Sequence, residues 1–144
     1  VHSAPCPVLI VPRAWRAPRW VLAPVHGGSY ARRGLLAAAV LARAYKGRLA
    51  MVEVVDDPVN GPYAAKRLSV QAEKLPPAVF RDVRPELEVR AGNPVKEILR
   101  AEHARDIVVL VAHRKSFLGD MVLGTTVERV LRHSRIPVLA IPSR

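Results

Sequence analysis

The chain has 144 residues, a length that suits one domain with its own hydrophobic core. Half of the residues are hydrophobic, which argues against extensive disorder, and the single cysteine excludes an internal disulfide framework. The net charge of +11 favours acidic partners, but the arginines are spread over every segment, and only residues 13–20 mix cations with aromatics compactly. We therefore expect an arginine-rich surface and no nucleic-acid partner.

The first apolar segment of the chain repeats the last one. Residues 2–12 read His-Ser-Ala-Pro-Cys-Pro-Val-Leu-Ile-Val-Pro, and residues 133–142 read His-Ser-Arg-Ile-Pro-Val-Leu-Ala-Ile-Pro. The repeat predicts an extra strand at Val8–Val11 that resembles the closing strand of a preceding repeat. We expect it to pair with Val138–Ile141, within the chain or across a dimer, because an uncovered sheet edge invites aggregation. The alternative is an unrelated short strand between prolines.

A proline-stiffened linker over residues 12–18 separates this strand from the rest. We therefore divide the chain into residues 1–18, the extra strand plus linker, and residues 19–144, a single domain. That domain opens with a strand over residues 20–25 and a helix that starts at the N-cap Ser29, runs to Lys46 and ends at Gly47. A second strand follows over residues 49–55, and such a strand-helix-strand unit implies a parallel sheet.

The second half alternates in the same way and sets the fold class. Asn93 is a good N-cap, and Pro94 suits the first helical position. The pattern predicts an α/β fold with an open five-stranded parallel sheet sandwiched by helices. The remaining predicted elements are a helix over 63–75 ended by Pro76-Pro77, a strand over 83–91, a helix from 94, a strand over 107–111, a helix opened by residues 124–126, and a strand over 138–141.

The last third of the chain resembles a known family. Gly124-Thr125, the Val-x-Arg-Val-Leu-Arg-His helix at 127–133 and Pro-Val-Leu-x-Ile at 137–141 are similar to the C-terminal signature of the universal stress proteins. The resemblance covers residues 19–142 in element order and implies an adenine nucleotide alpha hydrolase-like fold. It suggests the C-terminal domain of a tandem-type member or a divergent single-domain member.

The resemblance also points to a nucleotide crevice beyond the carboxyl ends of the strands. Nucleotide-binding members carry Gly-x2-Gly-x9-Gly-(Ser/Thr), and counted back from Gly124 the first two glycines fall on Arg114 and Val111. The family's nucleoside-contacting Asp at the end of the first strand is replaced by His26. The candidate binding residues are Val25, His26, Val54, Val55, Arg114, Lys115, Gly124, Thr125 and Thr126.

These departures decide the function that we expect. Only glycine lets the backbone approach a polyphosphate closely, and Val111 and Arg114 both carry a Cβ. We expect a non-catalytic universal stress protein-like domain in stress response or regulation, with a degenerate ATP site and no cofactor. One alternative is a nucleotide-binding domain that holds ATP or AMP through altered contacts from Arg114, Lys115, Gly124, Thr125 and His26. Another is a regulatory module of a larger protein, such as a transporter.

The sequence offers little support for an enzyme or a metalloprotein. The five histidines show no metal-ligand spacing, and Cys6 has no cationic helix end near it in sequence. The Asp56-Asp57 pair could hold Mg²⁺ with a nucleotide, although a loop turn also explains it. We expect a cytoplasmic protein that is a homodimer or pseudo-dimer through Val8–Val11 and Val138–Ile141, and that meets a membrane only indirectly, as part of a larger protein.

Overall fold

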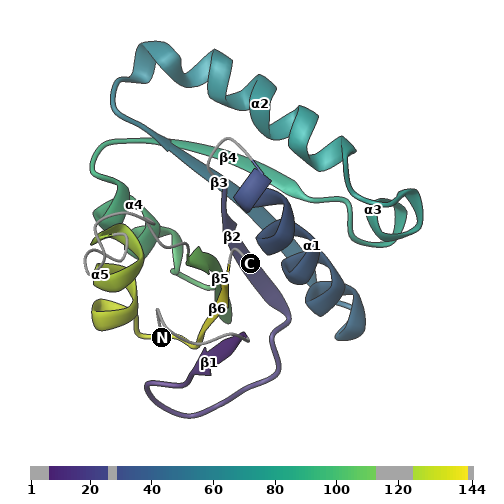
Figure 1. Ribbon diagram of the computed structural model, residues 1–144, viewed down its shortest axis with the longest axis vertical. Coiled ribbons are helices and arrows are strands. Elements are labelled where there is room, and N and C mark those ends of the chain that lie inside the picture. The colour runs from purple at the N-terminus through teal and green to yellow at the C-terminus, as the bar shows by residue number, and fades with distance from the viewer. Residues whose placement is uncertain (1–6, 26–28, 113–124, 143–144) are drawn as a thin grey trace.

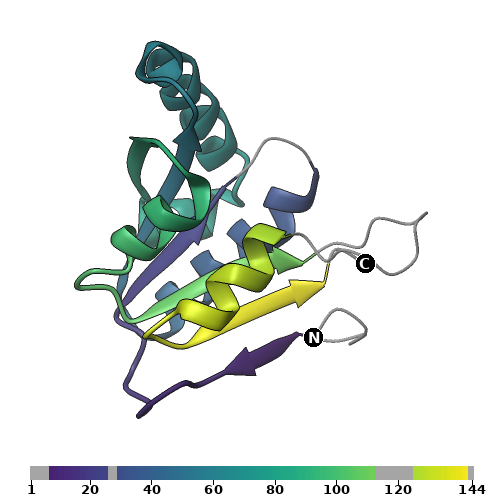
Figure 2. The same ribbon diagram turned by 90° about the vertical axis from the view of Figure 1, so that its left-hand side faces the viewer.

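The computed structural model describes residues 7–25, 29–112 and 125–142, and the side chains of 29–31, 112 and 125 are left out of the description. Within these ranges the chain forms a six-stranded sheet with helices on both faces (Figure 1). Helices α1, α2 and α3 cover one face, and α4 and α5 cover the other (Figures 1 and 2). Among the helices of the described residues, none has the length and apolar character needed to cross a bilayer.

The elements follow the alternating order that the sequence predicts. Two of them, a 3-10 turn at Pro58–Asn60 and the helix α3, were not expected. The strands are β1 (Val8–Ile10), β2 (Trp20–Pro24), β3 (Arg48–Val55), β4 (Glu86–Ala91), β5 (Ile107–Ala112) and β6 (Val138–Pro142). The helices are α1 (Ser29–Ala44), α2 (Gly61–Glu73), α3 (Pro77–Val83), α4 (Pro94–Ala101) and α5 (Thr125–His133).

The sheet topology confirms the predicted fold class. Strands β6-β5-β2-β3-β4 are parallel neighbours in that order. The added strand β1 runs antiparallel to β6, with Leu9 opposite Leu139. The predicted pairing of the first and last apolar segments is therefore present within the chain, so β1 covers the β6 edge.

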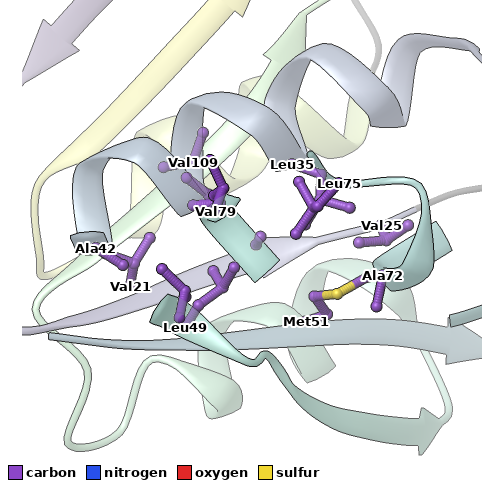
Figure 3. Packing of buried hydrophobic residues seen from close by; sticks show 14 of the residues in the cluster. Val21, Val25, Leu35, Ala42, Leu49, Met51, Ala72, Leu75, Val79 and Val109 are labelled. Carbon is purple, nitrogen blue, oxygen red and sulfur yellow. The ribbon is translucent and has the colours of Figure 1, made fainter. Parts of the chain in front are cut away.

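Strands β2, β3, β5 and β6 send alternate side chains into two hydrophobic layers, whereas the edge strand β4 contributes Val89 to only one of them. Val21 and Val109 face the layer under α1 and α3, where Leu35 and Val79 also pack (Figure 3). Leu22, on the same strand as Val21, faces the layer under α4 and α5. Because both of their faces are covered, these four strands are largely apolar, whereas β4 alternates polar and apolar residues.

The short helix α3 corrects the sequence prediction. We expected Pro76-Pro77 to end a helix and a strand to begin at Val83, but the strand begins at Glu86 and Val83 closes α3. Pro77 occupies the first turn of α3, where no backbone N–H is required. Val79 and Val83 lie four residues apart and are both buried, so their helical spacing is the signal that the prolines obscured.

The end of α1 also differs from the prediction. Gly47 was expected to end the helix, but α1 ends at Ala44 and Lys46 adopts the left-handed conformation with φ of 52°. Gly47 serves another purpose, because a Cβ there would collide with the carbonyl oxygen of Arg19. Gly47, just before β3, thus allows the backbone to approach Arg19, just before β2.

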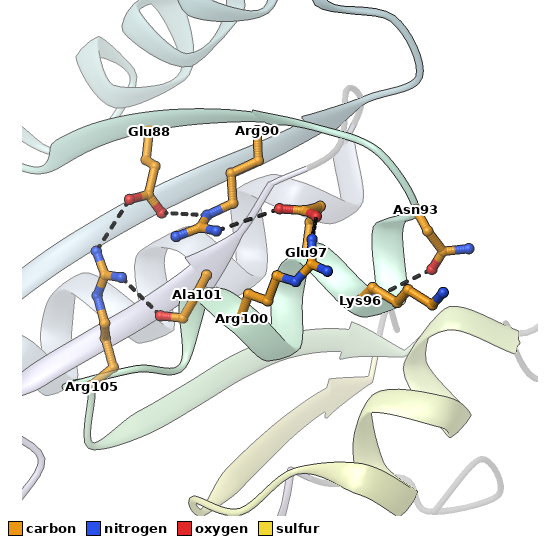
Figure 4. A network of polar contacts seen from close by, with 8 residues as sticks. All are labelled: Glu88, Arg90, Asn93, Lys96, Glu97, Arg100, Ala101 and Arg105. Atoms are coloured by element: carbon orange, nitrogen blue, oxygen red, sulfur yellow. Dashed lines mark hydrogen bonds and ion pairs between the residues drawn. The ribbon is translucent and has the colours of Figure 1, made fainter.

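Helix α4 is held by the cap that the sequence predicts and by a polar network (Figure 4). The Asn93 side chain accepts a hydrogen bond from the backbone N–H of Lys96 at 3.1 Å. Glu97 lies between two arginines, 3.4 Å from Arg90 of β4 and 2.6 Å from Arg100 of its own helix. These contacts link α4 to β4 and so fix the helix over the sheet.

Candidate functional site

The candidate crevice lies where the strand order of the sheet reverses. Strands β2, β3 and β4 follow one another in one direction, whereas β5 and β6 lie on the other side of β2. In open α/β sheets, ligands bind outside the carboxyl ends of the strands at such a reversal. The gap between the ends of β2 and β5 is therefore the position at which a nucleotide would be sought.

The structure brings together the predicted residues at the ends of β2 and β3. Val25 follows β2 directly, is buried, and donates its backbone N–H to the carbonyl oxygen of Val52 at 2.8 Å. Val54 and Val55 close the neighbouring strand β3, with Val55 buried and Val54 partly buried. All three side chains are apolar, so contacts to a polar ligand at this point would come from the main chain.

Residue 111, the first of the two positions at which the family resemblance places a glycine, lies inside β5. Val111 pairs with Ile141 of β6 and is partly buried. Its Cγ2 methyl lies against Gly34 of α1, so closely that a Cβ on Gly34 would collide with it. The side chain of Val111 therefore fills the space between β5 and α1 next to the candidate crevice.

The second half of the candidate site belongs to α5 and the residues before it. Helix α5 begins at Thr125, and the Thr126 side chain in its first turn is partly buried. A helix start of this kind presents free backbone N–H groups that suit an anion. His26, Arg114, Lys115 and Gly124 lie outside the described residues, so their predicted contacts stay predictions.

One member of the acidic pair after β3, Asp57, has a structural role. The Asp57 carboxylate accepts a hydrogen bond from the backbone N–H of Val59 at 2.9 Å and caps the 3-10 turn at Pro58–Asn60. Asp56 and Asp57 are both exposed. Within the described ranges, no group of three His, Cys, Asp or Glu side chains is placed to hold a metal ion.

A family model of the universal stress protein family matches residues 19–142, which is most of the chain. The chain belongs to the universal stress protein family. No protein among the curated sequences matches it.

Solved universal stress proteins share this fold. UspA from Lactobacillus plantarum is 20% identical with a TM-score of 0.61, covering 88% of this chain and 99% of its own. A protein from Archaeoglobus fulgidus is 21% identical with a TM-score of 0.73 and covers 98% of this chain. The match spans only 51% of that protein's length. A universal stress protein in complex with cAMP is 18% identical with a TM-score of 0.69, covering 90% of this chain and 100% of its own.

The two tryptophans in the aromatic and basic stretch at residues 13–20 of this universal stress protein have different surroundings. Trp15 is exposed, with Arg13, Arg16 and Arg19 exposed around it. The Trp20 ring, by contrast, is already stacked, with the guanidinium carbons of Arg48 and Arg105 at 3.8 and 4.4 Å from its centroid. Trp20 is thus part of the fold and is not free to stack on a base.

Sequence reasoning missed a pocket at the amino ends of β5 and β6. The candidate crevice lies at the opposite, carboxyl ends of the strands. The pocket has a volume of about 700 Å³ and lies between the carboxyl ends of α4 and α5. Its lining contains both cationic side chains and the buried Glu102. No motif marks this site, because Glu102 and the turn at residues 134–136 meet only after folding. The lining residues are Leu99, Arg100, Glu102, His103, His133, Arg135 and Ile136.

Proposed function

We propose that this universal stress protein domain is non-catalytic, acts in stress response or regulation, and has a degenerate ATP site. The observation that carries the proposal is Val111, which stands where nucleotide-binding members are expected to have glycine and packs its methyl group against Gly34. A β-branched side chain at this point keeps a polyphosphate away from the main chain. Arg114 replaces the second glycine in the sequence. A reducing, cytoplasmic setting is part of the proposal and rests on the single cysteine.

A nucleotide titration tests the proposal directly. Thermal unfolding is followed with ATP, AMP and cAMP at millimolar concentration. A ligand at about a hundred times its Kd adds about 2.7 kcal/mol to the free energy of unfolding, which is easily detected. We expect no change in Tm, while a universal stress protein that binds cAMP shifts in a parallel run. A saturable rise in Tm with ATP or AMP would remove the degenerate site from the proposal.

The second candidate is a nucleotide-binding domain with altered contacts. It is favoured by the retained helix start at Thr125 and Thr126 and by the complex of a structural neighbour with cAMP. In this version the charges of Arg114, Lys115 and His26 would take over from backbone donors. A measurable nucleotide affinity that falls at least about tenfold in both Arg114→Ala and Lys115→Ala would establish it.

We further propose that β1 takes the place of a partner's closing strand and makes the domain a pseudo-dimer. The support is the antiparallel pairing of Val8–Ile10 with β6, which uses the edge that a second copy would need. Removing residues 1–11 should then expose this edge and produce a concentration-dependent dimer in sedimentation experiments, whereas the full chain stays monomeric. A full chain that dimerises as strongly as the shortened one would contradict the pseudo-dimer and support a homodimer.

A further inference from the structure

The pocket between α4 and α5 contains an acidic group with incomplete hydrogen bonding. Glu102 directly follows α4 and is only 7% exposed. One carboxylate oxygen, Oε1, accepts a hydrogen bond from the backbone N–H of Arg135 at 3.3 Å. The other oxygen, Oε2, is buried and has no partner among the described residues. Buried carboxylate oxygens are normally satisfied, so Oε2 indicates a donor that the described residues do not supply. The nearby Ser134 hydroxyl donates to the carbonyl oxygen of Ile136 at 2.8 Å.

The backbone around this carboxylate also favours positive charge. Helices α4 and α5 both end at the pocket, with Leu99 and Arg100 in the last turn of α4 and His133 as the last residue of α5. The carboxyl end of a helix carries a partial negative charge and carbonyl groups that lack helical partners. The carbonyl oxygens of Leu99 and Arg100 accept hydrogen bonds from the backbone N–H groups of Glu102 and His103. The helix ends therefore contribute their partial negative charge, and together with Glu102 this charge makes the pocket suitable for an ammonium group.

The rim of the same pocket has the opposite charge. Arg100, His103, His133 and Arg135 are all exposed there. Arg100 is already paired with Glu97 at 2.6 Å, whereas Arg135 has no carboxylate within 4 Å in the part of the chain that the structure describes. Arg135 is therefore the rim group that is available to hold an anion next to the carboxylate-lined interior.

Apolar side chains complete the lining. Leu99 of α4 and Ile136, just before β6, are partly buried and pack with the layer under α4 and α5. The volume of about 700 Å³ lies within the range of about 300–1,000 Å³ found for small-molecule sites. The pocket thus combines an acidic inner wall, a basic rim and an apolar side wall at a size that suits a small metabolite.

We propose that this pocket binds a small zwitterion of the α-amino-acid class with an apolar side chain. The ammonium group pairs with the Glu102 carboxylate, whose buried Oε2 becomes accessible when the side chain turns toward the pocket, and it faces the helix ends. The carboxylate meets Arg135 at the rim, and the side chain lies against Leu99 and Ile136. This site is separate from the candidate nucleotide crevice, which lies at the carboxyl ends of the strands. The proposal therefore does not depend on whether that crevice binds a nucleotide.

Heteronuclear NMR titration of the full chain tests the proposal with L-valine, L-leucine, L-isoleucine and L-phenylalanine as probes. Two analogues of leucine each lack one charge: 3-methylbutylamine has no carboxylate, and 4-methylpentanoate has no ammonium. We expect at least one amino acid to shift the amides of residues 99–103 and 133–136 with a Kd of about 1 mM or tighter. Both analogues should bind at least about tenfold more weakly than leucine.

Matched variants locate the interaction. Glu102→Gln keeps the shape of the side chain and removes its charge, and Arg135→Gln removes the rim cation; each should weaken binding at least about tenfold. The controls Glu73→Gln and Arg81→Gln change the same charges at exposed positions of α2 and α3 and should leave the Kd unchanged. Absence of binding by all four amino acids overturns the proposal. So does equal binding of 4-methylpentanoate, which would indicate a simple anion site, or retained affinity in Glu102→Gln with native amide spectra.

Discussion

Gly34 of α1 lies directly against the Cγ2 methyl of Val111 at the end of β5, and the space between them leaves no room for a Cβ on the glycine. This contact joins the helix that follows the first strand of the domain to the strand that leads to the candidate phosphate loop. A bulky residue at 111 is therefore matched by the absence of a side chain at 34. The Val111 side chain is therefore accommodated by packing against α1.

The first prediction concerns Gly34→Ala. Alanine favours the helix over glycine by about 1 kcal/mol, but overpacking against Val111 costs about 1–3 kcal/mol. We expect the free energy of unfolding to fall in urea denaturation. In the Val111→Ala background the same change should raise it, because the methyl group that blocks the Cβ is gone. Gly61→Ala is the control, since a Cβ there meets nothing within 4 Å. A stabilising effect of Gly34→Ala in the native background would contradict the packing argument.

The second prediction ranks the two arginines on Trp20. Arg105 is only 11% exposed and also donates to the carbonyl oxygen of Ala101 at 2.8 Å. Arg48 is 58% exposed, so solvent screens its contact with the ring. Arg105→Met should lower the free energy of unfolding by about 1–3 kcal/mol, and Arg48→Met by less than about 1 kcal/mol. Fluorescence-detected unfolding in a Trp15→Phe background reports on Trp20. A loss in Arg48→Met that equals or exceeds the loss in Arg105→Met would contradict this ranking.

The strands and the longer helices could be predicted because their signals are local. The apolar run at Ile107–Ala112 reads as a buried strand whatever lies around it, and Asn93-Pro94 marks a helix start by chemistry alone. The repeat of Pro-Val-Leu at both ends also indicated the pairing of β1 with β6. Such patterns lie within short stretches of the sequence, so they can be recognised without the three-dimensional structure.

The features that escaped prediction depend on contacts made in three dimensions. Whether Pro77 ends one helix or begins another is decided by the burial of Val79 and Val83. Glu102 reads as an ordinary surface residue, and only the turn at Arg135 encloses it. The topology places a candidate crevice at the ends of β2 and β5, but the positions around Arg114 that would decide its chemistry fall outside the described residues.

The third prediction tests the buried ion pair between β3 and α2. Glu53 is 5% exposed, and its Oε1 accepts from Arg67 Nε at 3.0 Å and from Nη2 at 2.8 Å. Arg67→Met leaves a buried carboxylate without its partner and should lower the free energy of unfolding by about 1–3 kcal/mol. The upper part of the usual range is not expected, because the Arg67 side chain is 51% exposed.

Two variants control this measurement. Arg132→Met breaks an exposed pair with Glu128 on α5 and should cost less than about 0.5 kcal/mol. Adding Glu53→Gln to Arg67→Met removes the unpaired charge and should recover part of the lost stability. Equal losses for the exposed and the buried pair would show that burial of Glu53 is not what makes the contact matter.

The fourth prediction restores the glycine positions of the candidate phosphate loop. If side chains at 111 and 114 are what exclude a polyphosphate, Val111→Gly/Arg114→Gly should bind ATP in isothermal titration calorimetry where the native chain does not. The double variant should also be less stable by about 1–3 kcal/mol, because Val111→Gly leaves a gap beside Gly34. Titrations are therefore run well below its Tm.

The single variant Arg114→Gly, with Val111 in place, should show no affinity for ATP. Failure of the folded double variant to bind ATP would place the defect elsewhere, with His26 as the next position to change.

The fifth prediction concerns the pH dependence of stability through Glu102. Burial raises the pKa of this carboxyl above its usual value, against smaller opposing effects from Ser134 and Arg135. Because the folded pKa lies above the unfolded one, the stabilising effect of protonation is present at low pH and is lost as pH rises through the folded pKa. The basic side chains that line the same pocket, those of Arg100, His103, His133 and Arg135, are unchanged in a Glu102→Gln variant. The free energy of unfolding of Glu102→Gln relative to the native chain should therefore rise between pH 4 and pH 7, as measured by urea denaturation.

Glu73→Gln, at an exposed position, should give no comparable rise. A difference that falls as the pH increases would mean that folding favours the charged carboxylate, as expected if Ser134 and Arg135 outweigh its burial.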